Sequence, residues 1–400
     1  MSKERKTPAV LGLDMGGTHT DAVLLRGGTL LASVKVPTNH QDLLVSTREA
    51  LHALFESGAA FPADVSRATF GTTLAVNAVV QNACAPVGLL IGAGPGLDPG
   101  WFGLGGHAAL VPGGVDHRGT EVAPPDREAI RRVVSGWREE GLAAFACVAK
   151  FSTRNPAHED AMAEVIREVF SDGPEPVIAL GHRLSGRLNF PRRIATAYWN
   201  AAVWTLHNRF ADAVEASLKD MGIDAPAYLL KADGGAIPLS VSRERPVEAL
   251  LSGPAASVMG MMALNTPIIT TLIGEGGSGG ALALSVADRV WMLENAVYSV
   301  ISPEGCASIL WKDAGKADEA AQRLKLTAWD ALDLGIIERV ISEKELGQSG
   351  FYTRLADRIE KELQVLMHQE DLLERRYARF RALGNPSAPP QPDHIHHTAR

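Results

Sequence analysis

Residues 10–25, VLGLDMGGTHTDAVLL, decide the fold of the first half of the chain. Two apolar runs, Val10–Asp14 and Asp21–Leu25, predict buried strands on either side of a turn that contains Gly16 and Gly17. A glycine pair between strands often makes no more than a hairpin turn. Here, however, a carboxylate ends the first strand and hydroxyl groups follow the glycines. Open backbone N–H groups, hydroxyls and a carboxylate suit a polyphosphate and its magnesium ion, so we expect a phosphate site at this turn.

After this segment, the sequence alternates between strand and helix patterns. A helix is expected over Leu43–Ser57, strands over Ala68–Phe70 and Ala85–Ile91, and a long helix over Ile194–Met221. Residues 92–125 are rich in Gly and Pro and are expected to form a loop or insertion. The alternation predicts an α/β fold with a largely buried sheet.

The composition changes near Thr266–Pro267. A strand is expected over Ile268–Ile273, followed by a second glycine-rich loop and then by helices that fill residues 316–383. A strand that ends in glycines before a small-residue helix directs unpaired N–H groups toward one point, which suits an oxyanion. The competing explanation is a turn in which glycine permits close packing of strand and helix. The tail, residues 385–400, is Pro-rich and is expected to be disordered.

Charge and composition exclude several classes of protein. The 400 residues carry a formal net charge of −7, so a broad nucleic-acid-binding face is not expected. No stretch stays apolar for the ~18 residues of a membrane helix, and the first residues lack the apolar segment of a signal peptide. The three cysteines are far apart and form no CxxC pair, which argues against disulfides and for a reducing compartment, the cytoplasm.

An ordered set of motifs runs through the first part of the chain. The motifs are GLDMGGTHTDAVLL, FGTTLAVNAVV, FSTRNPAHE, KADGGAIPL and RPVEALLSGPAASVMG. As a set, they resemble the hydantoinase/oxoprolinase family over roughly residues 8–264. Members of that family are ATP-using, ring-opening amidohydrolases with the actin-like ATPase fold, and they normally act with a second subunit. The resemblance therefore implies an incomplete actin-like ATPase lobe in the first part of the chain.

The same resemblance implies site residues. With ATP and Mg²⁺ as cofactors and Asp14 as the metal ligand, it implies a first phosphate loop formed by Asp14, Gly16, Gly17, Thr18 and Asp21. The neighbouring strand-to-helix turn would contain Thr72, Thr73 and Asn77. The inter-lobe cleft would be lined by Asp233, Gly234, Gly235 and the segment Ser252–Pro254. The family's second acidic glycine loop and its longer chain do not occur here, so the ATP cleft is expected to be incomplete.

The sequence after the junction resembles a different family. Residues 266–312 read TPIITTLIGEGGSGGALALSVADRVWMLENAVYSVISPEGCASILWK. Over about residues 265–384 the chain resembles the α subunit of bacterial acetyl-CoA carboxylase carboxyltransferase. That resemblance implies a partial crotonase-like α/β segment with a helical C-terminus, in which Gly276 and Gly277 are the catalytic, oxyanion-binding residues.

Substrates and partners follow from this second resemblance. The substrates would be acetyl-CoA and carboxybiotin on its carrier protein, and the product malonyl-CoA for fatty acid synthesis. The partners would be a carboxyltransferase β subunit and the biotin carrier protein. Another interpretation of the same loop is that Glu275–Ser278 is a degenerate second phosphate loop of the ATPase.

The simplest hypothesis is a chimera of residues 1–264, residues 265–384 and a tail at 385–400. Its origin as a natural fusion, a misassembled gene or an engineered chain is left open by the sequence. Three functions compete: an impaired carboxyltransferase component, an ATP-dependent amidohydrolase subunit of the hydantoinase type, or no catalysis because neither half is complete. Of the two activities, the faithful motif at 266–312 favours carboxyl transfer.

Overall fold

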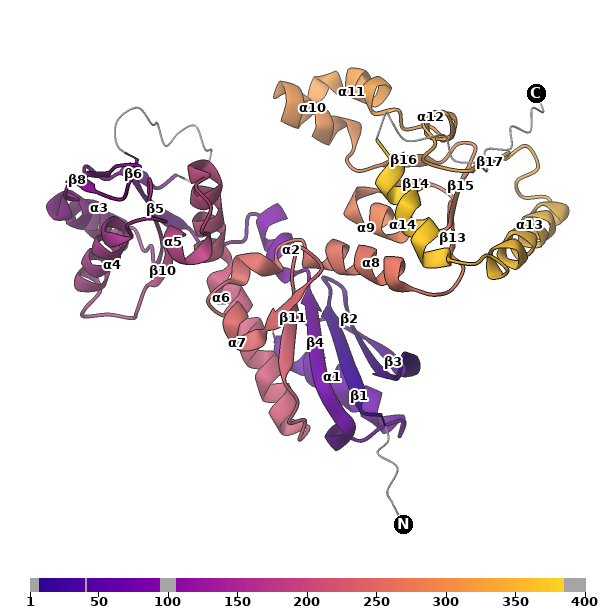
Figure 1. Cartoon of the computed structure of the whole chain (residues 1–400), viewed down its shortest axis with the longest axis horizontal. Coiled ribbons are helices and arrows are strands. Elements are labelled where there is room, and N and C mark those ends of the chain that lie inside the picture. Colours follow the sequence, from indigo (N-terminus) through magenta and orange to yellow (C-terminus); the bar gives the residue numbers. More distant parts are fainter. Residues whose placement is uncertain (1–6, 40–41, 94–105, 385–400) are drawn as a thin grey trace, which may run out of the picture. The chain divides into compact units, whose positions relative to one another are not determined.

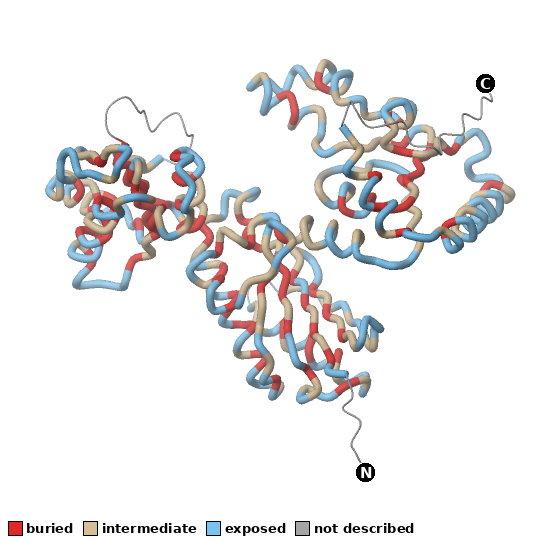
Figure 2. The backbone as a smooth tube through the Cα atoms, viewed as in Figure 1, coloured by how far each residue is buried: buried red, intermediate tan, exposed pale blue. Residues whose placement is uncertain are grey.

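The computed structural model describes residues 7–39, 42–93 and 106–384 (Figure 1). The predicted disordered tail, residues 385–400, lies outside these ranges. The chain divides into two units, Met1–Gly253 and Pro254–Arg400, which are described separately below. In both units the core strands contain many of the buried residues (Figure 2). No helix in the described ranges is both long and apolar enough to cross a membrane.

A six-stranded sheet organises the first unit. Its strands are β1 (Ala9–Met15), β2 (His19–Arg26), β3 (Thr29–Pro37), β4 (Val65–Thr72), β11 (Ala227–Leu230) and β12 (Ala236–Pro238). Their order in the sheet is β12-β11-β4-β1-β2-β3. The first three strands form an antiparallel meander, β4 runs parallel to β1, and β11 runs parallel to β4. The two strands predicted around the first glycine pair are therefore confirmed as β1 and β2.

The residue pattern of β1 shows that one face of this strand packs against the core. Alternate side chains, beginning at Ala9 and ending at Met15, are buried, whereas those between them are less so. The buried set joins a core cluster with Leu51 and Leu54 of α1 (Leu43–Glu56) and with the second half of α6 (Phe190–Asp220). These two helices thus cover the sheet that carries the first glycine loop.

The same unit contains a second sheet, which is parallel throughout. Its strands, in the order β10-β9-β5-β6, are β5 (Val87–Gly92), β6 (Ala108–Leu110), β9 (Ala144–Ala149) and β10 (Val177–Leu180). One face packs on α3 (Arg127–Glu139) and α4 (Ala157–Val169), and the other on the first half of α6. Burial on both faces explains why β5 and β9 are apolar at nearly every position.

Shorter elements complete the first unit. They are η1 (Pro62–Asp64), α2 (Leu74–Val80), β7 (Gly114–Val115), β8 (Glu121–Ala123), α5 (Gly181–Leu184), α7 (Leu239–Ser242), η3 (Pro246–Ala249) and α8 (Ser252–Ala263), which spans the boundary. Residues 92–125, which were expected to form a loop or insertion, contain some regular structure in their described part. Three short strands occur there, because β6 pairs with β5, and β7 pairs with β8.

The second unit has two small parallel sheets. One contains β13 (Ile269–Leu272), β15 (Arg289–Leu293) and β17 (Arg339–Ile341), and the other β14 (Glu275–Gly277) and β16 (Val297–Ser299). The helical elements are α9 (Ser278–Leu284), α10 (Pro303–Trp311), η4 (Ala314–Lys316), α11 (Ala317–Leu324), α12 (Ala328–Asp333), α13 (Ser349–Met367) and α14 (Leu372–Ala382). The expected run of helices over 316–383 is interrupted by β17, which pairs with β15. The predicted α/β class with a helical C-terminus is confirmed.

Candidate functional site

Three neighbouring strands of the six-stranded sheet end at the same edge (Figure 1). Asp14 near the end of β1 lies beside Gly71 of β4, and Phe70 of β4 lies beside Leu229 of β11. Because these strands are parallel, the segments that follow them meet at one edge, the usual place for a ligand in such sheets. We call this the Asp14 edge, and it comprises Asp14–Asp21, Gly71–Thr73 and Lys231–Gly235.

Two carboxylates face each other at the Asp14 edge. Asp14 and Asp21 are cross-strand partners in the β1–β2 ladder, and Lys35 of β3 forms an ion pair with Asp21 at 2.7 Å. Although Asp14 reaches solvent, its carboxyl group is partly buried by the surrounding residues of the sheet. This partial burial, together with the negative charge of Asp21, raises the pKa of Asp14, while Lys35 opposes the rise. A divalent cation bound here would relieve the repulsion between the two carboxylates.

The glycine loop between β1 and β2 is a tight hairpin. The backbone N–H of Gly16 donates to the carbonyl of His19 at 2.9 Å, and the Thr38 hydroxyl donates to the carbonyl of Gly16 at 3.0 Å. An added Cβ at Gly17 would lie 2.7 Å from the side-chain nitrogen of Asn77. The N–H of Gly16 is therefore already used within the hairpin turn. Thr18 is among the polar residues of this loop that reach solvent.

The turn between β4 and α2 packs against this hairpin. The N–H of Thr73 donates to the carbonyl of Met15 at 3.1 Å, and the Thr72 hydroxyl accepts from the N–H of Leu74 at 3.2 Å. The segment at the start of α8 also approaches, since an added Cβ at Gly253 would lie 3.3 Å from Cγ2 of Thr73. Next to it, the hydroxyl of Ser252 is buried and has no hydrogen-bond partner in the described part of the chain.

The loop after β11 closes on itself. Lys231 forms an ion pair with Asp233 at 2.7 Å, and the other carboxylate oxygen accepts from the N–H of Gly235 at 2.9 Å. The hydrogen bond from Lys231 lowers the pKa of the Asp233 carboxyl. Gly234 takes the positive φ of 80° that this turn requires. Asp233 thus stabilises its own loop, and Lys231 is neutralised by it.

Gly71, within the Asp14 edge, and Lys35, beside it on β3, had no role in the sequence analysis. An added Cβ at Gly71 would lie only 2.6 Å from Oδ1 of Asp14, so glycine at this position makes room for the carboxylate. A glycine at the end of a strand is a signal of such a close approach. Lys35 gave no local signal, because its partner is set by the register between β2 and β3.

The second glycine loop belongs to the other unit, and its two glycines differ. Gly276 pairs with Tyr298 in the β14–β16 ladder, and an added Cβ there would lie 2.5 Å from Cδ2 of Leu272. Close packing therefore explains Gly276. Gly277 is the N-cap of α9 and has open space where a Cβ would be. The strand that precedes the loop, β13, pairs with β15 of its own unit.

A resident metal site of the kind built from many side chains is absent from the described residues. No group of three or more His, Cys, Asp or Glu side chains converges within these ranges. Magnesium with bound phosphates needs only one or two protein carboxylates, since phosphates and waters supply the other ligands. Asp14 and Asp21 fit that requirement.

Comparison with known proteins matches two separate stretches of the chain to two different families. Residues 10–170 match the family described as hydantoinase/oxoprolinase N-terminal region, and residues 234–384 match the family described as acetyl co-enzyme A carboxylase carboxyltransferase-like. The chain carries parts of two families. We call the first unit, which contains the first match, the hydantoinase-like part, and the second unit, which contains most of the second match, the carboxyltransferase-like part. The chimera indicated by the motifs is thereby confirmed at the level of family.

Relatives of the carboxyltransferase-like part are carboxyl transferase α subunits of acetyl-coenzyme A carboxylase. The protein from Streptococcus thermophilus is 51% identical over 129 residues, which are 32% of this chain and 50% of the relative. That from Streptococcus pneumoniae is 50% identical over 129 residues, or 32% of this chain and 51% of the relative. The chain thus spans about half the length of the curated relatives it matches.

Solved structures show the fold of the larger part. An acetone carboxylase, described with ATP-dependent acetone carboxylation, has a TM-score of 0.58 and 17% identity and covers 68% of this chain and 43% of its own. An ATP-dependent caprolactamase from Pseudomonas jessenii has a TM-score of 0.54 and 25% identity and covers 67% and 42%. The expected actin-like fold of the hydantoinase-like part is consistent with these similarities.

The carboxyltransferase family match and the first structural unit overlap over residues 234–253. The carboxyltransferase family match begins at residue 234, ahead of the predicted junction. In the structure, however, Ala236–Pro238 is strand β12 and pairs with β11 in the six-stranded sheet. Residues up to Gly253 therefore belong structurally to the hydantoinase-like part.

Proposed function

We propose that the hydantoinase-like part binds the phosphates of ATP with Mg²⁺ at the Asp14 edge. The observation that carries the proposal is the pair of facing carboxylates, Asp14 and Asp21, beside loops that end three parallel strands. The buried, unpartnered hydroxyl of Ser252 next to Thr73 supports a polar ligand at the same place. Both structurally similar proteins are described as ATP-dependent.

Each residue would have a limited task in this binding. Asp14 and Asp21 would hold the magnesium ion or its waters, and Thr18 and Thr73 would hydrogen-bond phosphate oxygens. The nearby cations contribute little, because Lys35 and Lys231 are already paired with Asp21 and Asp233. One phosphate loop supplies about half of the contacts of a closed cleft, so we expect a Kd of about 1 mM, which corresponds to about 4 kcal/mol.

Calorimetric titration of the full chain with Mg–ATP tests this proposal. We expect weak, magnesium-dependent binding that Asp14→Asn abolishes. Asp64→Asn is the matched control, since Asp64 precedes the amino end of β4, at the opposite edge of the same sheet. Equal loss in both variants, or low-micromolar affinity that does not depend on Asp14, would contradict the proposed site.

The high identity of the carboxyltransferase-like part supports a second candidate function. We propose that residues 265–384 derive from a component that transfers a carboxyl group from carboxybiotin, on its carrier protein, to acetyl-CoA in the cytoplasm, acting with a β subunit. The backbone N–H of Gly277 would donate a hydrogen bond to the oxyanion that forms during transfer. Because the chain spans half of its relatives, we expect this activity to be severely impaired.

Malonyl-CoA formation, measured with and without a cognate β subunit and biotinylated carrier protein, tests the second function. We expect no measurable turnover in either case. Turnover that is lost in Gly277→Val would show instead that the loop is catalytically competent. Gly277 is the right position to change, because a side chain there meets open space, whereas Gly276→Val would clash with Leu272.

A further inference from the structure

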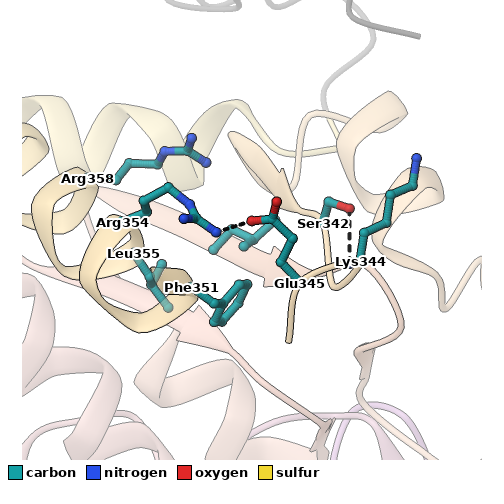
Figure 3. Close-up of a pocket in the computed structure, with 8 residues that line it drawn as sticks. Ser342, Lys344, Glu345, Phe351, Arg354, Leu355 and Arg358 are labelled. Atoms are coloured by element: carbon teal, nitrogen blue, oxygen red, sulfur yellow. Dashed lines mark hydrogen bonds and ion pairs between the residues drawn. The ribbon is translucent and has the colours of Figure 1, made fainter. Parts of the chain in front are cut away.

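A cavity of about 300 Å³ lies in the second unit, between the loop after β17 and the first turns of α13 (Figure 3). None of its side chains belongs to the Asp14 edge or to the Gly277 loop. Its volume is at the lower end of the range for small-molecule sites.

One side of the cavity is apolar. Phe351 and Ile341 line it and are buried members of the core cluster of this unit, and the partly buried Leu355 packs against them. Phe351 and Leu355 lie one helical turn apart on α13, so both face the same side. This surface is held in place by the core and is available to the apolar segment of a ligand.

The rim of the cavity carries an excess of positive charge. Lys344, Arg354 and Arg358 line it together with a single carboxylate, Glu345, which forms an ion pair with Arg354. Among the described residues, neither the ammonium group of Lys344 nor the guanidinium group of Arg358 has a hydrogen bond or an ion pair. Two cations at the rim are therefore uncompensated.

A further arginine adds to this charge. Burial lowers the pKa of Arg339 in β17, and the positive charge of Arg358 lowers it further, while Glu362 opposes the change. Glu362 is itself engaged at 2.8 Å by Arg289. An anion bound beside Arg358 would reduce the repulsion between the two guanidinium groups.

We propose that this cavity binds a small organic anion, such as a short-chain carboxylic acid or its phosphate monoester counterpart. Its oxyanion would contact Arg358 and Lys344, and its apolar segment would lie on Phe351 and Leu355. A guanidinium fork pairs with either oxyanion in two parallel hydrogen bonds, which is why both head groups are included. The proposal does not depend on either function proposed above.

The probes for the experiment are hexanoate, hexyl phosphate, hexanol and inorganic phosphate, titrated into the full chain at low salt and followed by protein-observed NMR. We expect saturable binding of hexanoate, of hexyl phosphate, or of both; whichever binds better identifies the head group. Hexanol and inorganic phosphate should each bind at least tenfold more weakly than the better probe, since each supplies only half of the contacts. Low salt is needed because the cations are exposed.

Variants locate the binding. Arg358→Ala, an exposed position that should not affect folding, should weaken binding at least tenfold, and Leu355→Asn should weaken it by reducing the apolar contact. Arg323→Ala is the matched control, an exposed arginine on α11 that pairs with Glu319. Equal affinity for hexanol and for the better of the two anionic probes, binding of none of the probes, or unchanged affinity in Arg358→Ala would overturn the proposal.

Discussion

At the scale of single residues, the Asp14 edge depends on one missing methyl group. Gly71 has a backbone that any residue can adopt, yet a Cβ there would meet the Asp14 carboxylate. Only glycine leaves enough room here for the Asp14 carboxylate in its present position. A larger residue would move this carboxylate, which we propose to hold magnesium.

We predict that Gly71→Ala displaces the Asp14 carboxylate and weakens Mg–ATP binding roughly tenfold, or about 1.4 kcal/mol. Crowding should also cost about 1–3 kcal/mol of stability. Calorimetry and urea denaturation measure the two effects. Gly186→Ala is the control, because a Cβ at Gly186 meets nothing within 4 Å; the same loss of affinity in that variant would refute the steric explanation.

A buried histidine gives the first unit a pH dependence. His207 on α6 shares a hydrogen bond of 2.9 Å with the hydroxyl of Ser242. Burial lowers the pKa of His207 to about 4, and the positive charge of Arg243 adds to the effect. Since the pKa in the unfolded chain is about 6.5, the unfolded state binds more protons between these two values, and the free energy of unfolding falls as the pH drops.

From this difference we predict a loss of about 2 kcal/mol of stability between pH 7 and pH 5 that depends on His207. Urea denaturation at both pH values should show a smaller loss in His207→Gln than in the wild type. His52→Gln, an exposed position on α1, should behave as the wild type does. If both variants lose as much stability as the wild type, His207 is not the group responsible.

Sequence could predict the Asp14 hairpin but not its neighbours. The alternation of apolar residues and the glycine pair are local, so β1, β2 and the turn follow from residues 10–25 alone. The roles of Gly71 and Lys35 depend on which residue stands opposite Asp14 or Asp21 in another strand. That register is set by packing between segments that are distant in sequence, so it could not be predicted from the local sequence pattern.

At the scale of elements, α14 is fixed to the start of the second unit by one side chain. Arg376 is buried and donates to both oxygens of Asp288, at 2.9 and 2.7 Å. It also donates to the backbone carbonyls of Met261, Leu264 and Thr266. The guanidinium thus joins α14, the residue before β15 and the segment before β13.

We predict that Arg376→Met destabilises the second unit by about 3–5 kcal/mol, because it leaves the buried carboxylate of Asp288 without its cationic partner, with only the backbone N–H of Ile268, among the described residues, still donating to it. Arg376→Lys should recover only part of the loss, since an ammonium group cannot form the bidentate pair. Denaturation followed by the fluorescence of buried Trp291 provides the measurement. Arg381→Met, an exposed position on the same helix, is the control, and an equal midpoint for it and Arg376→Met would argue against a structural role for Arg376.

Elements were predictable where their patterns were long. The helix over 194–221 and the strand over 85–91 were found close to their observed bounds, as α6 and β5. Strand β17 was missed because its residues, Arg339–Ile341, are too few to show a period. It exists as a strand because β15 offers it a partner.

At the scale of the whole molecule, each unit has its own hydrophobic core. Three buried clusters lie within the first unit and two within the second, in the described residues. Several large apolar side chains of the second unit are exposed, among them Ile273, Leu284 and Leu310. Such exposure agrees with a segment that spans half of its relatives.

Separate cores predict separate unfolding. We expect two transitions in differential scanning calorimetry, and 10 mM Mg–ATP should raise only the one that belongs to the hydantoinase-like part, by about 4 °C for a Kd of about 1 mM. Asp14→Asn should remove the shift and leave the other transition unchanged. One cooperative transition, shifted as a whole by nucleotide, would contradict independent units.

The contacts of Arg376 have a consequence for how such a chain can arise. Three of its five hydrogen bonds are made to backbone carbonyls, which every amino acid possesses. These three hydrogen bonds therefore depend on the path of the backbone and not on the side chains at residues 261–266. If a foreign sequence replaced the segment ahead of β13, Arg376 could still donate to its carbonyl groups, provided that its backbone followed the same course. The segment on the N-terminal side of this contact can therefore come from an unrelated protein. This gives a physical reason why pieces of unrelated proteins can be combined without unfolding the piece that follows.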